Sequence, residues 1–258
     1  MLEVMRAAGS DTLDTAMAYG DSESVLGAAG VRDLKVITKL PPLPPEPHDT
    51  GAWVREKVRH SLDRLQVPKL HGLLLHRPSD ALGARAPDLL EALASLKVEG
   101  VVAKIGVSVY EPNELAQLQG VMKLEIVQAP YNVLDRRFAD SGWFDRLRAA
   151  GTEIHVRSVF LQGLLLLDEA RLPAAFSRWR PIWQRWCEWT RRQGLDNLAA
   201  ALGFVLKNRN IARVVIGAEA AAQLRQIIAS AAALETDVPA ELATSDLNLL
   251  NPGNWTNK

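Results

Sequence analysis

The sequence predicts an α/β fold of the (β/α)8-barrel type, and three observations support this. Short, continuous apolar runs alternate with amphipathic segments, a pattern typical of parallel strands with helices on both faces. Three successive runs deliver polar residues near their ends, at Asp14, Lys39 and His76, and barrel enzymes collect catalytic residues at the C-terminal ends of strands. The 258 residues are close to the size of one barrel. We therefore expect a single domain over residues 1–258, with a tail at 248–258.

The expected elements follow one another in a regular βα order. Strands are expected at residues 12–16, 35–40, 72–76, 103–108, 125–129, 153–158 and 213–217. Helices are expected between them, for example at 52–65, 87–97, 142–149, 195–207 and 220–233.

These seven strands are one fewer than a barrel of this type needs. We place the gap at the N-terminus, where residues 1–8 resemble the second half of a first helix. Either the sequence is truncated there or another element fills the gap. The resulting hypothesis is an open seven-stranded barrel. Its two edge strands, 12–16 and 213–217, would be unpaired and would favour self-association.

Composition argues against several classes of protein. Thirty basic and thirty acidic residues give no net charge, which disfavours general binding to nucleic acid or to an anionic membrane. The single cysteine, Cys187, excludes an intrachain disulfide. No signal-peptide pattern opens the chain and no apolar run is long enough to span a bilayer. We therefore expect a cytoplasmic protein.

The stretch Asp11–Gly27 carries the first functional signal. Asp14 lies in an otherwise apolar run, and Tyr19 follows on a loop with Gly20. A buried carboxylate needs a partner, and Lys39 at the end of the next strand can supply one. His76 ends the third strand.

This pattern resembles the aldo-keto reductase family. The segment DTAMAYGDSESVLG is similar to the family signature, and VITKL and LLLHRP are similar to its next two strand ends. The resemblance runs from about Leu2 to the helix after Gly217. It implies hydride transfer between NADP or NAD and an aldehyde, ketone or sugar carbonyl. Tyr19 would donate the proton.

The resemblance also assigns roles to the residues around Tyr19. Lys39 would stabilise the phenolate, since a nearby ammonium lowers the pKa of a phenol. Asp14 would hold Lys39, and His76 would orient the substrate carbonyl.

Each of these residues also has a simpler interpretation. Asp14 alone could cap a loop, Tyr19 could be a packing residue, Lys39 a solvated strand end and His76 a core histidine. Their joint occurrence in this order favours the catalytic interpretation. Among the other histidines, His71 precedes its expected strand. His155 lies in mid-strand and is interpreted as a buried structural residue, with an approach to the barrel axis as the alternative. No metal-ligand spacing is found.

The resemblance implies a set of cofactor contacts in the fourth, fifth and sixth expected strands. Ser108 and Gln128 match residues that bind the nicotinamide carboxamide, although Val109 replaces the usual Asn. Arg157 occupies the position of the aromatic residue that stacks on the nicotinamide. Ser158 matches the Ser that follows this position, and Leu161 and Gly163 match the loop that passes the pyrophosphate.

The last expected strand departs from the family pattern. Gly217 is retained, but Glu219 occupies the position of the basic residue that clamps the 2′-phosphate of NADP. Gln223 replaces an Arg, and Ile227 replaces the Asn that contacts adenine. A carboxylate repels a phosphate and accepts a hydrogen bond from a ribose hydroxyl, so we expect NAD preference or weak cofactor binding. Alternatively, Arg225 restores the phosphate site.

Other features leave alternatives open. Trp179, Trp183, Trp186 and Trp189 share one helical face. We interpret them as packing residues, with a stacking wall for a sugar or aromatic substrate as the alternative. Trp255 either reaches the pocket mouth or lies in a disordered tail.

The substrate pocket is expected to draw on residues 41–49, Tyr110, 131–137 and 164–181. Arg136 and Arg137 are either surface charges or selectors of an anionic or sugar substrate. The partner is then a small carbonyl compound. A second functional hypothesis is a catalytically impaired family member that serves as a binding or regulatory protein, since the first strand is lacking and the phosphate clamp is eroded.

Overall fold

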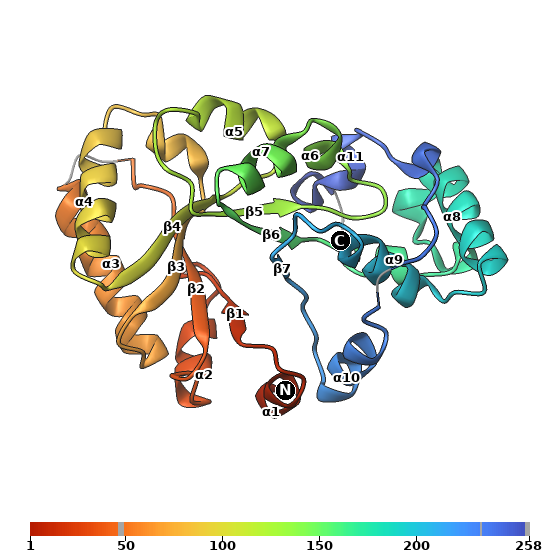
Figure 1. Cartoon of the computed structure of the whole chain (residues 1–258), viewed down its shortest axis with the longest axis horizontal. Helices are drawn as coiled ribbons and strands as arrows, with labels where there is room; N and C mark the ends of the chain where they lie inside the picture. The colour runs from red at the N-terminus through yellow and green to blue at the C-terminus, as the bar shows by residue number, and fades with distance from the viewer. Residues whose placement is uncertain (46–48, 233, 256–258) are drawn as a thin grey trace. The chain divides into compact units, whose positions relative to one another are not determined.

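A computed structural model describes residues 1–45, 49–232 and 234–255 (Figure 1). Its strands are β1 (Thr12–Asp14), β2 (Lys35–Leu40), β3 (Leu70–Leu75), β4 (Val102–Ser108), β5 (Ile126–Pro130), β6 (Glu153–Arg157) and β7 (Arg213–Val214). They are parallel and follow one another in chain order in a seven-stranded sheet. The prediction of seven parallel strands, with β1 and β7 as the first and last strands of the sheet, is confirmed.

Helices separate the strands, as the alternating pattern predicts. The α-helices are α1 (Leu2–Ala7), α2 (Ser22–Ala28), α3 (Thr50–Leu65), α4 (Ala86–Val98), α5 (Pro112–Leu118), α6 (Arg137–Asp140), α7 (Trp143–Ala149), α8 (Arg180–Arg192), α9 (Asn197–Leu206), α10 (Ala221–Ala229) and α11 (Leu247–Leu250). The described residues also form short 3₁₀ helices: η1 (Pro78–Ala81), η2 (Leu164–Leu166), η3 (Glu169–Arg171), η4 (Ala174–Trp179), η5 (Ala240–Leu242) and η6 (Pro252–Asn254). Across the described ranges, no helix is long and apolar enough to cross a membrane.

Several boundaries differ from the predicted ones, most of them by one or two residues. Strand β7 ends at Val214, because its neighbour β6 cannot continue past Ser158, whose φ is +60°. Helix α10 ends at Ala229, and the expected end at residue 233 lies outside the described residues. His71 lies inside β3 and does not precede it, because the strand begins at Leu70, which pairs with Val102.

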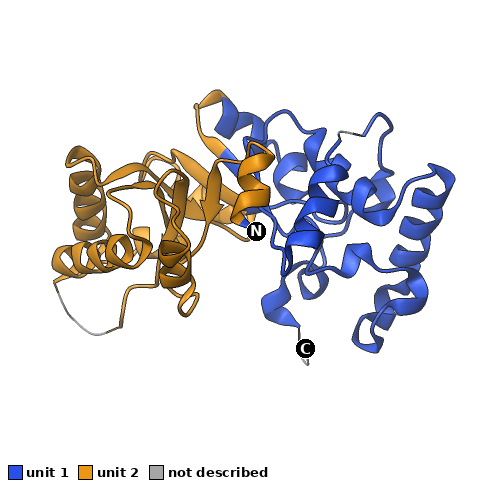
Figure 2. Cartoon of the chain, turned by 90° about the horizontal axis from the view of Figure 1, so that it is seen from below, with its two compact units in different colours: residues 1, 129–148, 154–258 blue, residues 2–128, 149–153 orange. Residues whose placement is uncertain are grey.

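The chain divides into two compact units, coloured separately in Figure 2. Unit 2 comprises residues 2–128 and 149–153 and contains β1 to β4 with α1 to α5. Unit 1 comprises residue 1, residues 129–148 and residues 154–258. The expectation of a single domain over 1–258 stays a prediction.

Unit 2 is centred on the buried inner residues of its strands. Ile37, Leu74 and Ile126 form one fully buried cluster. Strands β4 and β5 approach so closely at Gly106 that an added Cβ would lie 1.8 Å from the Ile126 carbonyl oxygen. Only glycine fits there, and this spacing brings the C-terminal ends of β4 and β5 together.

Unit 1 has its own apolar core around α8. Trp183 and Trp186 are fully buried in it, and Trp179 and Trp189 pack against it. The interpretation of these tryptophans as packing residues is confirmed. Trp255 packs on the same core and donates from Nε1 to the Leu249 carbonyl at 3.0 Å. It is therefore ordered within unit 1, and the disordered alternative is wrong.

Candidate active site

An ion pair between a buried lysine and a partly buried aspartate lies at the C-terminal ends of β1 and β2 in unit 2. The Lys39 side chain is 1% exposed, and its Nζ lies 2.6 Å from Asp14 Oδ2. The same ammonium donates to the Thr15 carbonyl at 2.8 Å. Asp14 ends β1, where it is aligned with Ile37. The predicted pairing of Asp14 with Lys39 is confirmed, and a buried charge of this kind is stable only because its partners replace the lost water.

Tyr19 lies on the short loop between β1 and α2. Gly20 adopts a φ of +57°, which glycine tolerates at no steric cost. A 3.0 Å hydrogen bond between the Thr15 and Ser22 hydroxyls joins the two ends of the loop. The loop directs the Tyr19 ring to a point 5.3 Å from Lys39 Nζ, while 49% of the residue stays exposed. A phenol next to a buried cation and open to solvent can exchange a proton with a bound molecule.

His76 follows β3 directly and completes the predicted set. Its backbone N–H continues the strand pairing by donating to the Leu40 carbonyl at 3.1 Å. Its imidazole meets the Tyr19 ring edge-on, with ring centroids 5.9 Å apart. The structure thus brings Asp14, Tyr19, Lys39 and His76 together at the ends of three neighbouring strands. A carbonyl oxygen placed there would face both a phenol and an imidazole.

Gln128 joins this cluster from β5 by a contact that the sequence does not predict. Its Nε2 donates to Asp14 Oδ1 at 2.7 Å, so that Asp14 accepts from Lys39 with one oxygen and from Gln128 with the other. Ser108 is aligned with Gln128 across β4 and β5, and both are buried. The two residues expected to bind a carboxamide are therefore neighbours, and Gln128 also touches the ion pair.

The buried carboxylate of Glu23 fixes α2, the helix that follows the Tyr19 loop. It accepts hydrogen bonds from Thr38 Oγ1 and Ser61 Oγ, both at 2.7 Å, and from Arg64 Nη2 at 2.6 Å. These bonds fasten α2, which follows the loop, to β2 and α3. Sequence reasoning missed Glu23, because nothing in a single sequence separates a buried carboxylate in an amphipathic helix from an exposed one.

The proline-rich segment after β2 is held in place by the residues that follow β3. Leu43 donates from its backbone N–H to Asp80 Oδ2 at 2.9 Å, and its carbonyl accepts from Arg77. Arg85 donates to the Pro44 carbonyl at 2.7 Å. These contacts fix the segment just beyond Lys39, while residues 46–48 of the predicted rim lie outside the described residues.

A strained loop follows β6 in unit 1. Ser158, Leu161 and Gln162 have φ values of +60°, +46° and +55°, and Gly163 has +88°. Left-handed backbone costs about 1–3 kcal/mol for each non-glycine residue and persists mainly at functional sites. The predicted contacts Ser158, Leu161 and Gly163 therefore share one loop of unusual backbone geometry. Arg157, at its entrance, donates to Ser158 Oγ at 3.3 Å.

The last predicted contacts lie before and on α10. The backbone N–H of Glu219 donates to Gln223 Oε1 at 2.8 Å, so the side chain of Gln223 caps the start of the helix. Gly217 precedes this turn, and an added Cβ there would have nothing within 4 Å. Gln223 is thus bound within the chain as well as facing the pocket described next.

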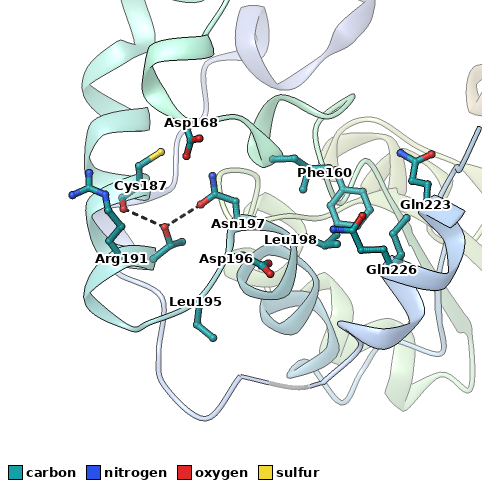
Figure 3. Close-up of a pocket in the computed structure, with 13 residues that line it drawn as sticks. Phe160, Asp168, Cys187, Arg191, Leu195, Asp196, Asn197, Leu198, Gln223 and Gln226 are labelled. Atoms are coloured by element: carbon teal, nitrogen blue, oxygen red, sulfur yellow. Dashed lines mark hydrogen bonds between the residues drawn. The ribbon is translucent and has the colours of Figure 1, made fainter.

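A pocket of about 400 Å³ lies within unit 1, between α8, the start of α9 and α10 (Figure 3). It is lined by Phe160, Leu166, Asp168, Cys187, Thr190, Arg191, Leu195, Asp196, Asn197, Leu198, Gln223, Gln226 and Ile227. Figure 3 shows the Arg191 guanidinium pointing away from Gln223 and Gln226. Burial raises the pKa of the Cys187 thiol above its ordinary value. The lining is therefore a mixture of apolar groups, neutral polar groups, two carboxylates and the Arg191 guanidinium.

Arg136 and Arg137 have structural partners that sequence analysis did not suggest. Arg136 donates to the Pro239 carbonyl at 2.8 Å and lies 4.8 Å from the Phe204 ring centre. Arg137 pairs with the buried Asp135 at 2.8 Å. Both guanidinium groups are therefore used within the fold. Tyr131 is likewise buried, between Phe144 and Phe204.

Comparison with known proteins gives one consistent result. A model of the aldo/keto reductase family matches residues 1–245. The chain is 29% identical to aflatoxin B1 aldehyde reductase member 2 of Rattus norvegicus, over 61% of this chain and 46% of that protein. It is 25% identical to the NADH-specific methylglyoxal reductase of Escherichia coli, over 69% of this chain and 59% of that protein. The chain spans about half the length of the curated relatives it matches.

Solved structures show the same fold. The holo form of aldo-keto reductase AKR11C1 from Bacillus halodurans superimposes with a TM-score of 0.72 and 24% identity, covering 93% of this chain and 83% of that chain. The strand order and this likeness together identify the (β/α)8-barrel fold.

Proposed function

The chain belongs to the aldo/keto reductase family, and on this premise we propose that it reduces an aldehyde, ketone or sugar carbonyl with a nicotinamide dinucleotide. The observation that carries the proposal is the buried Lys39–Asp14 pair beneath an exposed tyrosine, with Nζ 5.3 Å from the Tyr19 ring.

Four side chains have separate roles in the proposed proton transfer. Tyr19 donates its phenolic proton to the carbonyl oxygen as negative charge develops there. Lys39 stabilises the phenolate that remains, because a cation close to the ring favours the charged form. Asp14 fixes the ammonium, and His76 hydrogen-bonds the carbonyl oxygen and orients it. A reduced nicotinamide supplies the hydride when it is bound.

The residues of unit 1 suit the rest of a dinucleotide. The loop of residues 158–163 is the proposed pyrophosphate contact, and its strained backbone is held by hydrogen bonds from the Leu161 and Gly163 N–H groups to the Ser158 and Phe160 carbonyls. The pocket of about 400 Å³ is lined by Gln223 and Ile227, the positions that the family uses for the adenosine end. Ser108 and Gln128 remain the proposed carboxamide contacts, and Arg157 the residue that stacks on the ring.

We further propose that NAD(H) is preferred to NADP(H). Glu219 occupies the place of the basic clamp, and the pocket lining includes the carboxylates of Asp168 and Asp196. Arg191 also lines the pocket, but its guanidinium points away from Gln223 and Gln226 (Figure 3). Carboxylates accept hydrogen bonds from ribose hydroxyls and repel a 2′-phosphate. Arg225, the alternative phosphate ligand, is not among the described pocket residues. One relative is named an NADH-specific reductase.

The proposed substrate is a small carbonyl compound, in keeping with relatives named for an aldehyde and for methylglyoxal. The alternative, a catalytically impaired binding or regulatory protein, is disfavoured because all four residues expected to carry the reaction lie together in unit 2. Self-association through an open sheet edge stays a proposal, as does the absence of nucleic-acid and membrane partners.

The test is reduction of methylglyoxal and of an aromatic aldehyde, followed as loss of NADH or NADPH absorbance. Tyr19→Phe is expected to lower kcat by at least about a thousandfold, as loss of the general acid would. Tyr131→Phe, in the buried core, is the matched control and is expected to keep activity. Wild-type protein that is folded, binds a nicotinamide dinucleotide and yet reduces no carbonyl would favour the impaired alternative.

Cofactor preference is tested by quenching of tryptophan fluorescence during separate titrations with NADH and NADPH. We expect NADH to bind at least about tenfold more tightly, a difference of about 1.4 kcal/mol. Glu219→Arg is expected to reduce or reverse this preference. Tighter NADPH binding by the wild-type protein would contradict the proposal and point to Arg225 or Arg191.

A further inference from the structure

Two buried tryptophans of α8 hold the backbone of η2. Trp183 donates from Nε1 to the Leu164 carbonyl and Trp186 donates to the Leu165 carbonyl, both at 3.1 Å. Both side chains are at most 1% exposed. Because a buried indole N–H needs an acceptor and a buried carbonyl needs a donor, each bond satisfies two groups at once.

A third carbonyl of this segment, that of Leu167, also accepts hydrogen bonds from α8 and from the start of α9. The Leu167 carbonyl accepts from Asn197 Nδ2 at 3.2 Å and from the Cys187 thiol at 3.8 Å. Asn197 is in turn bound to Thr190 of α8 at 3.0 Å, a bond drawn dashed in Figure 3. Helix α8 and the first residue of α9 therefore fix almost every carbonyl from Leu164 to Leu167.

The segment held in this way directly follows the strained loop of residues 158–163. At the other end of the loop, Asn132 Nδ2 donates to the Ser158 carbonyl at 2.9 Å. Three non-glycine residues in the left-handed region would relax unless the surrounding structure fixed both ends. Backbone hydrogen bonds from Leu161 to Ser158 and from Gly163 to Phe160 close the loop internally. The side chains of Asn132, Trp183 and Trp186 hold its two ends against the rest of unit 1.

The face of α8 next to the tryptophans lines the pocket. Cys187, Thr190 and Arg191 contribute to its wall, and Phe160 of the strained loop contributes opposite them. One helix therefore both shapes the pocket and fixes the loop beside it.

We infer that Trp183 and Trp186 are positioning residues for the dinucleotide: their indole N–H groups hold the loop of residues 158–163 in the backbone conformation that receives the pyrophosphate and adenosine. This inference rests on the proposed function. It assigns the tryptophans a role beyond filling the core, since the N–H group, and not only the ring, is required.

The experiment measures the binding of the two halves of the cofactor separately. Trp183→Phe and Trp186→Phe keep an aromatic ring and remove the N–H donor, and Trp189→Phe on the same helix is the control. We expect the first two variants to bind ADP-ribose about fivefold more weakly, as loss of one hydrogen bond implies. Binding of nicotinamide mononucleotide is expected to stay unchanged. Hydrogen exchange of the free protein should accelerate at residues 158–167 and not in α9.

A second substitution tests whether a loss of ADP-ribose affinity comes from altered packing. Replacing Trp183 by benzothienylalanine keeps the shape of the indole and exchanges only the N–H for sulfur. The same loss of ADP-ribose affinity with unchanged thermal stability would support the inference. Hydrogen exchange that stays unchanged at residues 158–167 would overturn the inference. Equal weakening of ADP-ribose and nicotinamide mononucleotide binding, with faster exchange throughout the protein, would also overturn it and leave a purely structural role.

The outcome also distinguishes this inference from the proposed function. Wild-type protein that binds neither ADP-ribose nor NADH would overturn the proposed function, and this inference with it. Wild-type binding that is matched by both tryptophan variants would overturn only the inference.

Discussion

The strand-end cluster of unit 2 and the loop of unit 1 hold their functional groups in different ways. Asp14 lies within a strand, Lys39 within the next, and His76 directly after a third, so regular backbone pairing places each side chain. The loop of residues 158–163 departs from regular geometry and depends on Asn132, Trp183 and Trp186. The first region uses side chains on a rigid backbone, and the second uses backbone kept in place by side chains.

The largest effect should come from breaking the buried ion pair of the first region. Lys39→Met is expected to lower kcat by about a thousandfold and to destabilise the fold by up to about 3–5 kcal/mol, because the partly buried Asp14 loses its charge partner. Enzyme assays and urea unfolding measure the two effects.

Lys35→Met is the matched control on the same strand. Lys35 pairs with Asp11 at the same 2.6 Å, but the two side chains are 46% and 47% exposed. Removing an exposed pair is expected to cost less than about 1 kcal/mol and to leave activity intact. Equal losses in the two variants would show that burial does not distinguish these pairs.

A smaller effect is expected when the backbone of the second region is restricted. Gly163→Ala adds a Cβ that meets no atom within 4 Å, so its cost comes only from the φ of +88°. That cost is about 1–2 kcal/mol, measured by urea unfolding, and ADP-ribose affinity should fall with it.

Gly83→Ala is the corresponding control, since its Cβ is equally unobstructed and its φ lies outside the left-handed region. It is expected to be neutral or slightly stabilising. Full ADP-ribose affinity in Gly163→Ala would argue that the loop does not contact the cofactor.

The smallest effect is expected at the N-terminal ends of the unit 2 strands, opposite the strand-end cluster. We expect ion pairs there to contribute to stability and not to activity. Partial burial opposes ionisation of Glu153, but hydrogen bonds from Lys104 and His71 lower its pKa to about 2. A lowered carboxyl pKa stabilises the fold above the ordinary pKa, and this stabilisation is lost as the pH falls from about 4.5 towards 2.

Glu153→Gln is therefore expected to cost about 1 kcal/mol at pH 7, with solvent screening of the partly exposed pair taken into account. The difference from the wild-type protein should shrink below pH 4.5, as measured by urea unfolding across pH. A loss of stability that stays constant down to pH 2 would contradict this assignment. Activity at pH 7 should be retained, in contrast to Lys39→Met.

Much of the first region could be predicted from the sequence. Continuous apolar runs identify parallel strands, and the carboxyl ends of such strands gather at one edge. An acid, a lysine and a histidine at three consecutive ends therefore had to be neighbours, and the pairing of Asp14 with Lys39 follows from the cost of burying a lone carboxylate. The spacing of the tryptophans likewise determined the buried face of α8.

Only the tertiary structure decided the partners that lie far apart in the chain. Gln128 reaches Asp14, Glu23 binds Arg64, and the α8 tryptophans reach Leu164 and Leu165. Arg136 and Arg137 are used within the fold, and His71 lies inside β3 beside Glu153. The reason is physical: local sequence determines the period and type of an element, whereas the partner of a polar side chain depends on which elements packing brings within hydrogen-bond distance.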